Sequence, residues 1–342
     1  MRYQLLGKSG LRVSELCLGT MTFGEDYGWG AGKEQSRAVY QAFTEAGGNF
    51  IDTANSYTNG TSEAYLGEFM QGHRAQVVLA TKYTSAAPGT DPNAGGNQRK
   101  NMMQACEASL KRLKTDYLDL YWLHAWDQIT PVEEVMRAFD DLIRQGKVLY
   151  CGVSDAPAWW VARANTIAEL RGWSPFVGLQ IEYSLLERTV ERELIPAARA
   201  LGLTVAAWSP LAGGVLTGKY AKDGSGRRFD NEGMKQFMAG GDRQARVVAA
   251  VQQVAKEVGR SPAQVALAWL RHRTVPVIPI IGARKQEQLK DNLASLDVAL
   301  NAEQIRHLDE AGAIELGFPH DFYTKDMVRG LIYGGLRDRI DA

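Results

Sequence analysis

The chain has 342 residues, of which 45% are apolar and 23% are charged. These proportions predict a globular protein with a sizeable core, and the length suits one large domain spanning residues 1–342. Lysine and arginine together number 39, as do aspartate and glutamate, so the formal net charge is zero. A neutral chain without a run of about 18 apolar residues argues against a nucleic-acid partner, a membrane-surface protein and a membrane-spanning helix.

The three cysteines, Cys17, Cys106 and Cys151, lie far apart in apolar or helical surroundings. This spacing is typical of core thiols in a reducing compartment and not of a disulfide framework. The first residues, Met-Arg-Tyr-Gln-Leu-Leu-Gly, lack the pattern of a signal peptide. We therefore expect a cytoplasmic protein.

Strand-like and helix-like segments alternate along the chain. Residues 3–13 contain two short strand-like runs around Gly-Lys-Ser-Gly and predict a β-hairpin. Further strand-like runs cover residues 16–19, 49–52, 77–82, 117–123, 148–153, 178–182, 204–208 and 277–281. Helical patterns between and after these runs predict an α/β fold, a (β/α)8 TIM barrel over about residues 14–312. Residues 313–342 are expected to form a C-terminal tail with additional helical segments.

Two sequence signals predict where helices begin. Thr130-Pro131-Val132-Glu133 has the pattern of a capping box with proline at the first helical position, and Gly146 is the expected end of that helix. Ser261-Pro262-Ala263-Gln264 repeats the same start signal. The first of these helices should follow the fourth strand of the barrel.

Several other kinds of site are disfavoured by missing motifs. A doubly wound dinucleotide-binding sheet would carry G-x-G-x-x-G, which does not occur in the chain. Gly213 to Lys219 reads G-x-x-x-x-G-K, as in a phosphate-binding loop, but Tyr220 stands where serine or threonine would bind magnesium. The histidines and cysteines show no ligand spacing and no G-x-S-x-G is present, so neither a metal site nor a serine hydrolase is predicted.

Four polar residues lie at or just after the ends of successive predicted strands: Asp52, Tyr57, Lys82 and His124. The carboxyl ends of barrel strands meet at one rim, so an acid, a phenol, an amine and an imidazole should share a proton-transfer site there. Each residue alone has a common structural explanation, such as a turn cap, a surface aromatic, a solvated lysine or a core histidine. Their joint occurrence favours the catalytic interpretation.

Seven ordered motifs support that interpretation. They are Gly47-Gly48-Asn49-Phe50-Ile51-Asp52-Thr53-Ala54 with Tyr57, Ala80-Thr81-Lys82, Leu118-Asp119-Leu120-Tyr121-Trp122-Leu123-His124, Gly152-Val153-Ser154, Gln180-Ile181-Glu182-Tyr183-Ser184, Trp208-Ser209-Pro210-Leu211, and Ile280-Ile281-Gly282-Ala283-Arg284. In these motifs the chain resembles the aldo-keto reductases over about residues 1–312. Within that family it resembles the aryl-alcohol-dehydrogenase-like branch and the potassium-channel β-subunits.

The resemblance implies an oxidoreductase that reduces an aldehyde or ketone to an alcohol, reversibly, with a hydride from NADPH. It makes Tyr57 the general acid, with Lys82 stabilising the phenolate, Asp52 holding the lysine charged and His124 orienting the carbonyl oxygen. Two alternatives stay open: the resemblance to channel subunits leaves room for a regulatory or interaction protein that binds the same cofactor, and the barrel also suits another enzyme, such as an isomerase or a lyase. NADH is a less expected cofactor than NADPH.

The predicted cofactor-binding residues are Thr20, Met21, Asp52, Ser154, Asp155, Gln180, Trp208, Ser209, Pro210, Leu211, Gly213, Lys219, Gly282, Arg284, Gln288 and Asn292. Trp208 is expected to stack on the nicotinamide ring, and Arg284 should bind a ribose 2′-phosphate near a helix N-terminus, which favours NADPH. Ser154 and Gln180 are expected to hydrogen-bond the carboxamide. The family usually has asparagine where this chain has Asp155, which can only accept hydrogen bonds when ionised.

The substrate is less well specified by the sequence. Tyr27, Trp29 and Trp126 are expected to line an apolar pocket for a small-molecule carbonyl substrate. These aromatic residues, and those of the tail, could instead serve packing or subunit contacts. A homo-oligomer is therefore left open.

Overall fold

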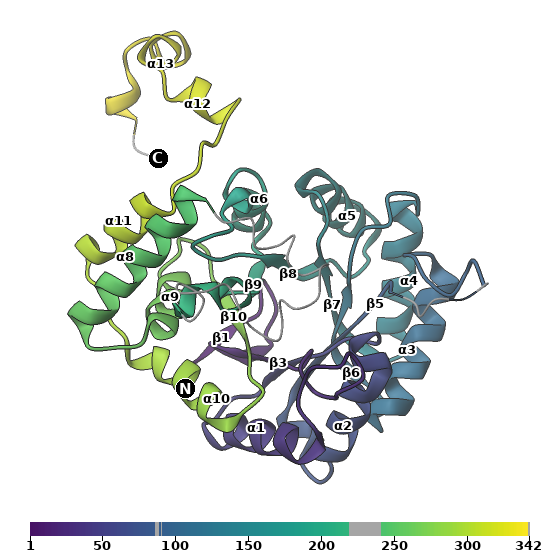
Figure 1. The fold of residues 1–342 in the computed structure, drawn as a ribbon. Helices are drawn as coiled ribbons and strands as arrows, with labels where there is room; N and C mark the ends of the chain where they lie inside the picture. Colours follow the sequence, from purple (N-terminus) through teal and green to yellow (C-terminus); the bar gives the residue numbers. More distant parts are fainter. Residues whose placement is uncertain (86–88, 90, 219–240, 341–342) are drawn as a thin grey trace.

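The computed structural model describes residues 1–85, 89, 91–218 and 241–340. Eight parallel strands close into a barrel in the order β10-β3-β4-β5-β6-β7-β8-β9, and helices surround it (Figure 1). A separate antiparallel hairpin precedes the barrel. The predicted (β/α)8 barrel and its N-terminal hairpin are confirmed.

The strands coincide closely with the apolar runs in the sequence. They are β1 (Tyr3–Leu5), β2 (Arg12–Ser14), β3 (Cys17–Gly19), β4 (Phe50–Asp52), β5 (Val78–Tyr83), β6 (Leu118–Leu123), β7 (Val148–Ser154), β8 (Phe176–Glu182), β9 (Thr204–Trp208) and β10 (Val277–Gly282). The helices are α1 (Lys33–Glu45), α2 (Thr61–Phe69), α3 (Arg99–Leu113), α4 (Val132–Arg144), α5 (Ala158–Arg171), α6 (Leu194–Leu201), α8 (Asp242–Val258), α9 (Pro262–Arg271), α10 (Gln286–Leu293), α11 (Ala302–Ala311), α12 (His320–Tyr323) and α13 (Asp326–Tyr333).

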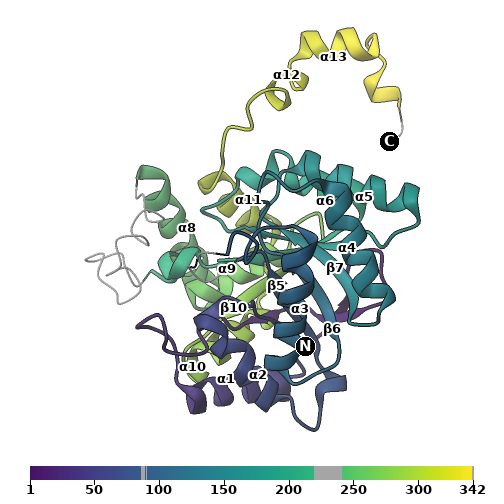
Figure 2. The same cartoon turned by 90° about the vertical axis from the view of Figure 1, so that its right-hand side faces the viewer.

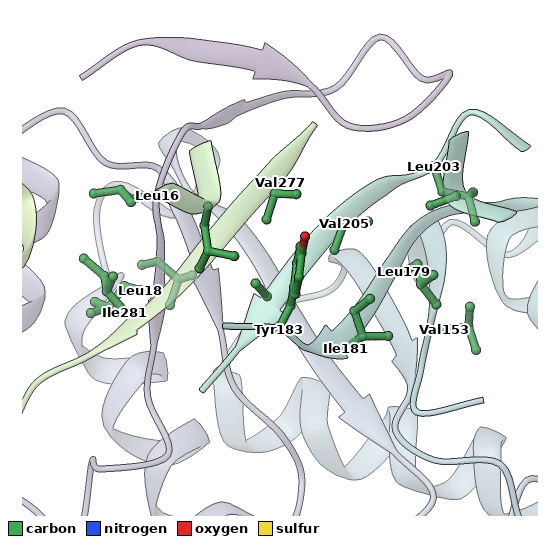
Figure 3. Close-up of a cluster of buried hydrophobic side chains, with 14 of the residues drawn as sticks. Leu16, Leu18, Val153, Leu179, Ile181, Tyr183, Leu203, Val205, Val277 and Ile281 are labelled. Carbon is green, nitrogen blue, oxygen red and sulfur yellow. The ribbon is translucent and has the colours of Figure 1, made fainter. Parts of the chain in front are cut away.

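The larger hydrophobic core lies between the barrel and its helices. Side chains alternate across a strand, so every second residue of each strand points outward to this layer. Leu179 and Ile181 of β8 belong to it, and neighbouring strands add Val153 and Val205 (Figure 3). Burial of such aliphatic side chains stabilises the fold by about 1.5–3 kcal/mol each, which makes this layer the main support of the barrel.

A second hydrophobic cluster fills the barrel interior. Leu6 and Val13 of the hairpin join inward-facing residues such as Cys17 and Phe50, and all four are fully buried. The Gly7 amide donates to the Thr204 hydroxyl at the start of β9, at 2.7 Å. The hairpin therefore closes the amino-terminal end of the barrel, and the opposite end stays available for a site.

Trp122 of β6 fills the interior below that open end. Its indole lies against Gly152 of β7 and Gly178 of β8, where an added Cβ would lie 2.3 Å and 2.8 Å from ring carbons. Only glycine leaves room for the ring at these two strand positions. The packing of this tryptophan therefore depends on both glycines.

One of the two predicted capping boxes is confirmed and the other is wrong. Ser261 caps α9 with Gln264 and proline at the helix start, as predicted. In α4, however, Pro131 is the N-cap residue and no side chain caps the helix. The Thr130 hydroxyl instead donates to Asp127 at 2.5 Å, because that loop carboxylate competes for it.

The C-terminal tail stands apart from the barrel. Figures 1 and 2 show α12 and α13 projecting away beyond α11, on the side of α5 and α6. Several large apolar side chains of this segment are exposed, including Phe318, Met327 and Leu331. None of the helices that the structure describes is both long and apolar enough to cross a membrane. Cys17, Cys106 and Cys151 are buried free thiols, as predicted.

Candidate active site

The four residues predicted to form a proton-transfer site come together at the open end of the barrel. The Lys82 ammonium forms an ion pair with Asp52 and donates to the Tyr57 hydroxyl at 3.1 Å. It also donates to the Thr53 carbonyl at 2.8 Å. The ring of His124 lies edge-on to that of Tyr57, with centroids 5.9 Å apart. We call Asp52, Tyr57, Lys82 and His124 the tetrad.

The loop after β4 places Tyr57 over the barrel. Thr58 and Asn59, which follow it, both have positive φ, a backbone conformation that is uncommon for residues other than glycine. The Thr58 hydroxyl holds the turn by donating to the Phe23 carbonyl at 2.7 Å. The Tyr27 hydroxyl donates to the Ser56 carbonyl at 2.7 Å and connects the first loop to the same turn.

The electrostatics of the lysine and tyrosine follow from burial and from their contacts. Burial acts to lower the pKa of Lys82, but Asp52 and Tyr57 outweigh it, and the pKa lies above the ordinary value. Burial raises the pKa of Tyr57, and Lys82 opposes this rise without cancelling it. At neutral pH the site therefore holds a charged lysine beside a protonated phenol.

Burial also keeps the imidazole of His124 neutral. Burial, together with the nearby charge of Lys82, lowers the pKa of its imidazole to about 3. Its Nδ1 atom is buried and has no hydrogen-bond partner among the described residues. A neutral ring retains one N–H that can donate to a substrate oxygen.

The ends of β7, β8 and β9 bring four predicted cofactor residues together. Ser154 pairs with Gln180 across neighbouring strands, and the Gln180 side chain donates to Asp52 at 3.0 Å. The Trp208 indole N–H donates to the Asp155 carboxylate at 3.0 Å. The Ser154 hydroxyl oxygen is buried and unpartnered among the described residues. Gln180 thus supports the tetrad as well, a contact that the sequence did not indicate.

The loop after β9 turns sharply with positive φ at Ser209, Ala212 and Gly213. The Ser209 hydroxyl accepts from the Gly213 amide at 3.1 Å, and Pro210 and Leu211 lie within the turn. Lys219, which was also predicted to bind the cofactor, lies outside the described residues.

The predicted phosphate-binding residues surround the N-terminus of α10. Arg284 precedes the helix, and its amide donates to the Gln288 side chain at 2.9 Å. The Asn292 side chain reaches the Gly282 carbonyl at 3.5 Å. Asp291 faces the other way, because it accepts from Ser261 and from Gln264 on α9. The Asp291 carboxylate therefore does not oppose an anion beside Arg284.

Thr20 and Met21 follow β3 at the same rim. The Thr20 side chain is fully buried and donates to the Asp52 carbonyl at 3.1 Å, so it fixes the strand end that carries the tetrad acid. Met21 is partly exposed beside it.

An open pocket of about 520 Å³ adjoins these strand ends. Trp126 and Trp208 line it, together with Gln128, Asp155, Ala156, Pro157, Ile181, Glu182, Glu187, Thr189, Val190 and Leu194. Trp126 packs edge-on against Trp159, with centroids 5.5 Å apart. The other two predicted pocket residues, Tyr27 and Trp29, do not line this pocket and pack on each other at 5.7 Å.

Glu182 is a residue of this rim that the sequence pattern did not single out. Burial raises the pKa of its carboxyl group to about 7, with further contributions from Glu187 and Asp155. It lies two residues beyond Gln180 on β8, so strand alternation puts both on the inner side of the barrel. That alternation was the signal that could have identified it.

Comparison with known proteins identifies the family of the chain. The family model described as "Aldo/keto reductase family" matches residues 15–313. A putative aryl-alcohol dehydrogenase, AAD14, of Saccharomyces cerevisiae is 38% identical over 341 residues, which cover 95% of this chain and 90% of the relative. A norsolorinic acid reductase of Aspergillus flavus is 39% identical over 330 residues, which cover 93% of this chain and 82% of the relative.

A third relative, an aryl-alcohol dehydrogenase [NADP(+)] of Phanerodontia chrysosporium, is 39% identical over 339 residues, with 93% of this chain and 87% of the relative covered. These alignments extend over nearly the whole chain, and the family model covers the complete barrel. The protein is an oxidoreductase and belongs to the aldo/keto reductase family.

Proposed function

We propose that the protein reduces an aldehyde or ketone to an alcohol, and catalyses the reverse reaction, with NADPH as hydride donor and Tyr57 as general acid. The observation that carries this proposal is the placement of the Lys82 ammonium between Asp52 and the Tyr57 hydroxyl. A partly buried phenol held protonated beside a fixed cation can give up its proton and leave a stabilised phenolate.

The tetrad divides the work of this proton transfer. Tyr57 donates a proton to the carbonyl oxygen, and Lys82 stabilises the resulting phenolate. Asp52 keeps the lysine charged and in place. The neutral imidazole of His124 orients the carbonyl oxygen through an N–H donor. General acid catalysis of this kind contributes about 10²–10⁴-fold to a rate.

The residues around Ser154 suit a nicotinamide. Ser154 is only 1% exposed, and its hydroxyl lacks a partner among the described residues, which leaves it available for a carboxamide. Gln180 is the second candidate for that group, and Trp208 offers a flat face for the ring. A bound nicotinamide would supply the hydride, and these residues would hold it toward the substrate carbon.

Arg284 supports the choice of NADPH. It stands at the start of α10 without a salt bridge to any described residue, and Asp291 is turned away from it. Helix N-termini and guanidinium groups both favour phosphate. One relative is named for NADP(+), which agrees with this proposal for the present chain.

We expect an aromatic substrate. Relatives are named for aryl alcohols and for norsolorinic acid. In this chain, Trp126 lines the open pocket beside Trp208, and aliphatic residues such as Ile181 and Val190 complete its walls. Aromatic and aliphatic walls favour a ring-bearing carbonyl compound.

The proposal is tested with Tyr57→Phe, which removes only the phenolic oxygen. Reduction of aromatic aldehydes by NADPH should fall by about 10²-fold or more, with cofactor affinity within about twofold of wild type. Tyr65→Phe, at a partly exposed tyrosine outside the tetrad, is the matched control. Near-normal turnover of Tyr57→Phe would contradict the assignment.

A further inference from the structure

Asp155 occupies an unusual position at the end of β7. Its backbone has a φ of 43°, and its amide donates to the Gln180 carbonyl at 3.2 Å. Its carboxylate accepts from the indole N–H of Trp208 at 3.0 Å. The side chain is thereby held beside the tryptophan and immediately after the buried, unpartnered hydroxyl of Ser154.

Glu182 adds a second carboxyl group to this location. It is the register partner of Trp208 on the neighbouring strand, and it lines the same pocket as Asp155. The pKa of Glu182 is raised to about 7 by burial first, and then by Glu187 and Asp155. These like charges are therefore close enough to affect one another.

Among the described residues, no ion pair neutralises the carboxyl groups of Asp155 and Glu182, whereas Glu187 also feels the charge of the Arg243 guanidinium. None of the salt bridges between described residues involves Asp155, Glu182 or Glu187. Burial raises the pKa of Asp155, and the hydrogen bond from Trp208 and the charge of Lys82 oppose this rise. The Lys82 ammonium is itself paired with Asp52. Within the part of the chain that the structure describes, the negative charge of Asp155 and Glu182 beside Trp208 is thus not balanced by an ion pair.

We propose that Asp155, supported by Glu182, holds the oxidised, positively charged nicotinamide more tightly than the neutral reduced ring. This inference rests on the proposed function, because it requires the ring to lie at Trp208 and Ser154. It extends that function by assigning a redox-state preference to a carboxylate next to the hydride-transfer position.

The charge balance of the reaction gives the reason. During carbonyl reduction, a hydride leaves the reduced ring with both electrons of its C–H bond and bonds to the carbonyl carbon, while the oxygen takes the Tyr57 proton. The ring is oxidised and acquires one positive charge. Asp155 attracts that charge as it develops, so it favours hydride departure and slows release of the oxidised cofactor.

A purely structural role for Asp155 makes a different prediction. If the carboxylate only orients Trp208 through the indole N–H, the side-chain oxygen of asparagine can accept the same hydrogen bond. Asparagine also tolerates positive φ, so Asp155→Asn should preserve the turn and remove only the charge.

The test measures the dissociation constants of NADP+ and of NADPH separately, without substrate, by tryptophan fluorescence and by NADPH emission. Asp155→Asn should weaken NADP+ binding by about fivefold or more and leave NADPH binding within about twofold. Glu182→Gln should act in the same direction with a smaller effect, since its carboxyl is only partly ionised near pH 7. Glu169→Gln, at an exposed carboxylate of α5, is the matched control and should change neither constant.

The outcomes separate this inference from the proposed function. If Asp155→Asn weakens both cofactors equally, or neither, the redox-state preference is overturned while the proposed reaction stands. If the wild-type protein binds neither cofactor, the proposed function and this inference both fail. Circular dichroism of each variant shows whether it is folded, and Glu182→Gln provides a second reading that does not depend on the Asp155 turn.

Discussion

At the residue scale, the site depends on charges that burial and neighbours have set. Lys82 is fully buried and remains charged because Asp52 is bound to it. His124 is neutral because burial and the nearby charge of Lys82 both lower the pKa of its imidazole. The tetrad therefore combines one cation, one anion and two neutral donors, and this is the combination that proton delivery to an oxygen needs.

The neutral state of His124 predicts a pH effect on stability. The folded pKa of about 3 lies below the ordinary value near 6.5, so the unfolded chain binds more protons between these values. Stability contributed by this histidine should thus be complete above about pH 6.5 and decline as the pH falls. Between pH 7 and 5, the melting temperature of wild type should fall more than that of His124→Gln.

Comparing the wild type with His124→Gln isolates the contribution of His124 to the pH dependence of stability. Glu182, with its raised pKa, contributes in the opposite direction, since its stabilisation is lost as the pH rises toward 7, but it is present in both proteins. Parallel melting curves across this pH range would show that His124 is not buried in its neutral form.

Arg284 gives a prediction on cofactor choice. Arg284→Ala should weaken NADPH binding by roughly tenfold or more, because a charge-assisted phosphate contact contributes about 1.5–3 kcal/mol. NADH, which lacks the 2′-phosphate, should bind almost unchanged. Arg260→Ala, at an exposed arginine after α8, is the control. Equal losses for both cofactors would mean that Arg284 supports the loop instead of binding phosphate.

At the scale of single elements, the barrel strands carry both structure and site. Outward-facing residues pack against the helices, and inward-facing residues fill the barrel or reach its rim. Trp122 shows how closely the two functions are joined. Its ring lies under the rim and has space only because β7 and β8 carry glycine beside it.

Gly152→Ala should therefore destabilise the protein. An added Cβ would lie 2.3 Å from carbons of the Trp122 ring, so the indole or the strand must move. Overpacking of this kind costs about 1–3 kcal/mol, measurable as a lower midpoint in urea denaturation. Gly10→Ala is the control, since an added Cβ there meets nothing within 4 Å. A midpoint equal to that of the control would contradict the packing described for Trp122.

At the scale of the whole molecule, the barrel is closed at one end by the hairpin and open at the other, while the tail reaches away from it (Figure 2). The tail exposes Phe318 to 85%, Leu331 to 77% and Met327 to 69%. Exposed apolar surface of this extent is typical of an interaction site. The tail also carries basic and acidic residues in similar numbers, which does not favour an anionic membrane as its partner.

We expect the tail to mediate self-association. A segment that bears positive charges, negative charges and apolar side chains can pair with its own copy in a symmetric contact. Sedimentation velocity should show a dimer or larger species for wild type and a monomer for Leu331→Asp. Arg329→Gln, which shifts the charge by the same one unit on the same helix, should behave like wild type. A monomeric wild-type protein would refute this expectation.

The sequence by itself determined the barrel, the hairpin, the tetrad and the family. Strands and helices follow from local apolar periodicity, and the ends of parallel strands must meet at one rim, so the order of residues along the chain was enough to place Asp52, Lys82 and His124 together. The Ser261 cap was also readable, because its partner lies three residues away.

Only the tertiary structure decided which contacts form between residues distant in sequence. Gln180, for example, was found to support Asp52, 128 residues away. The Thr130 cap failed for a local reason, because Asp127, three residues before it, competes for its hydroxyl. The pKa values of Tyr57, His124 and Glu182 and the charge around Asp155 result from burial and from contacts across strands. Such energies arise only when the chain is folded, because desolvation and Coulomb interactions depend on distance in space and not along the sequence.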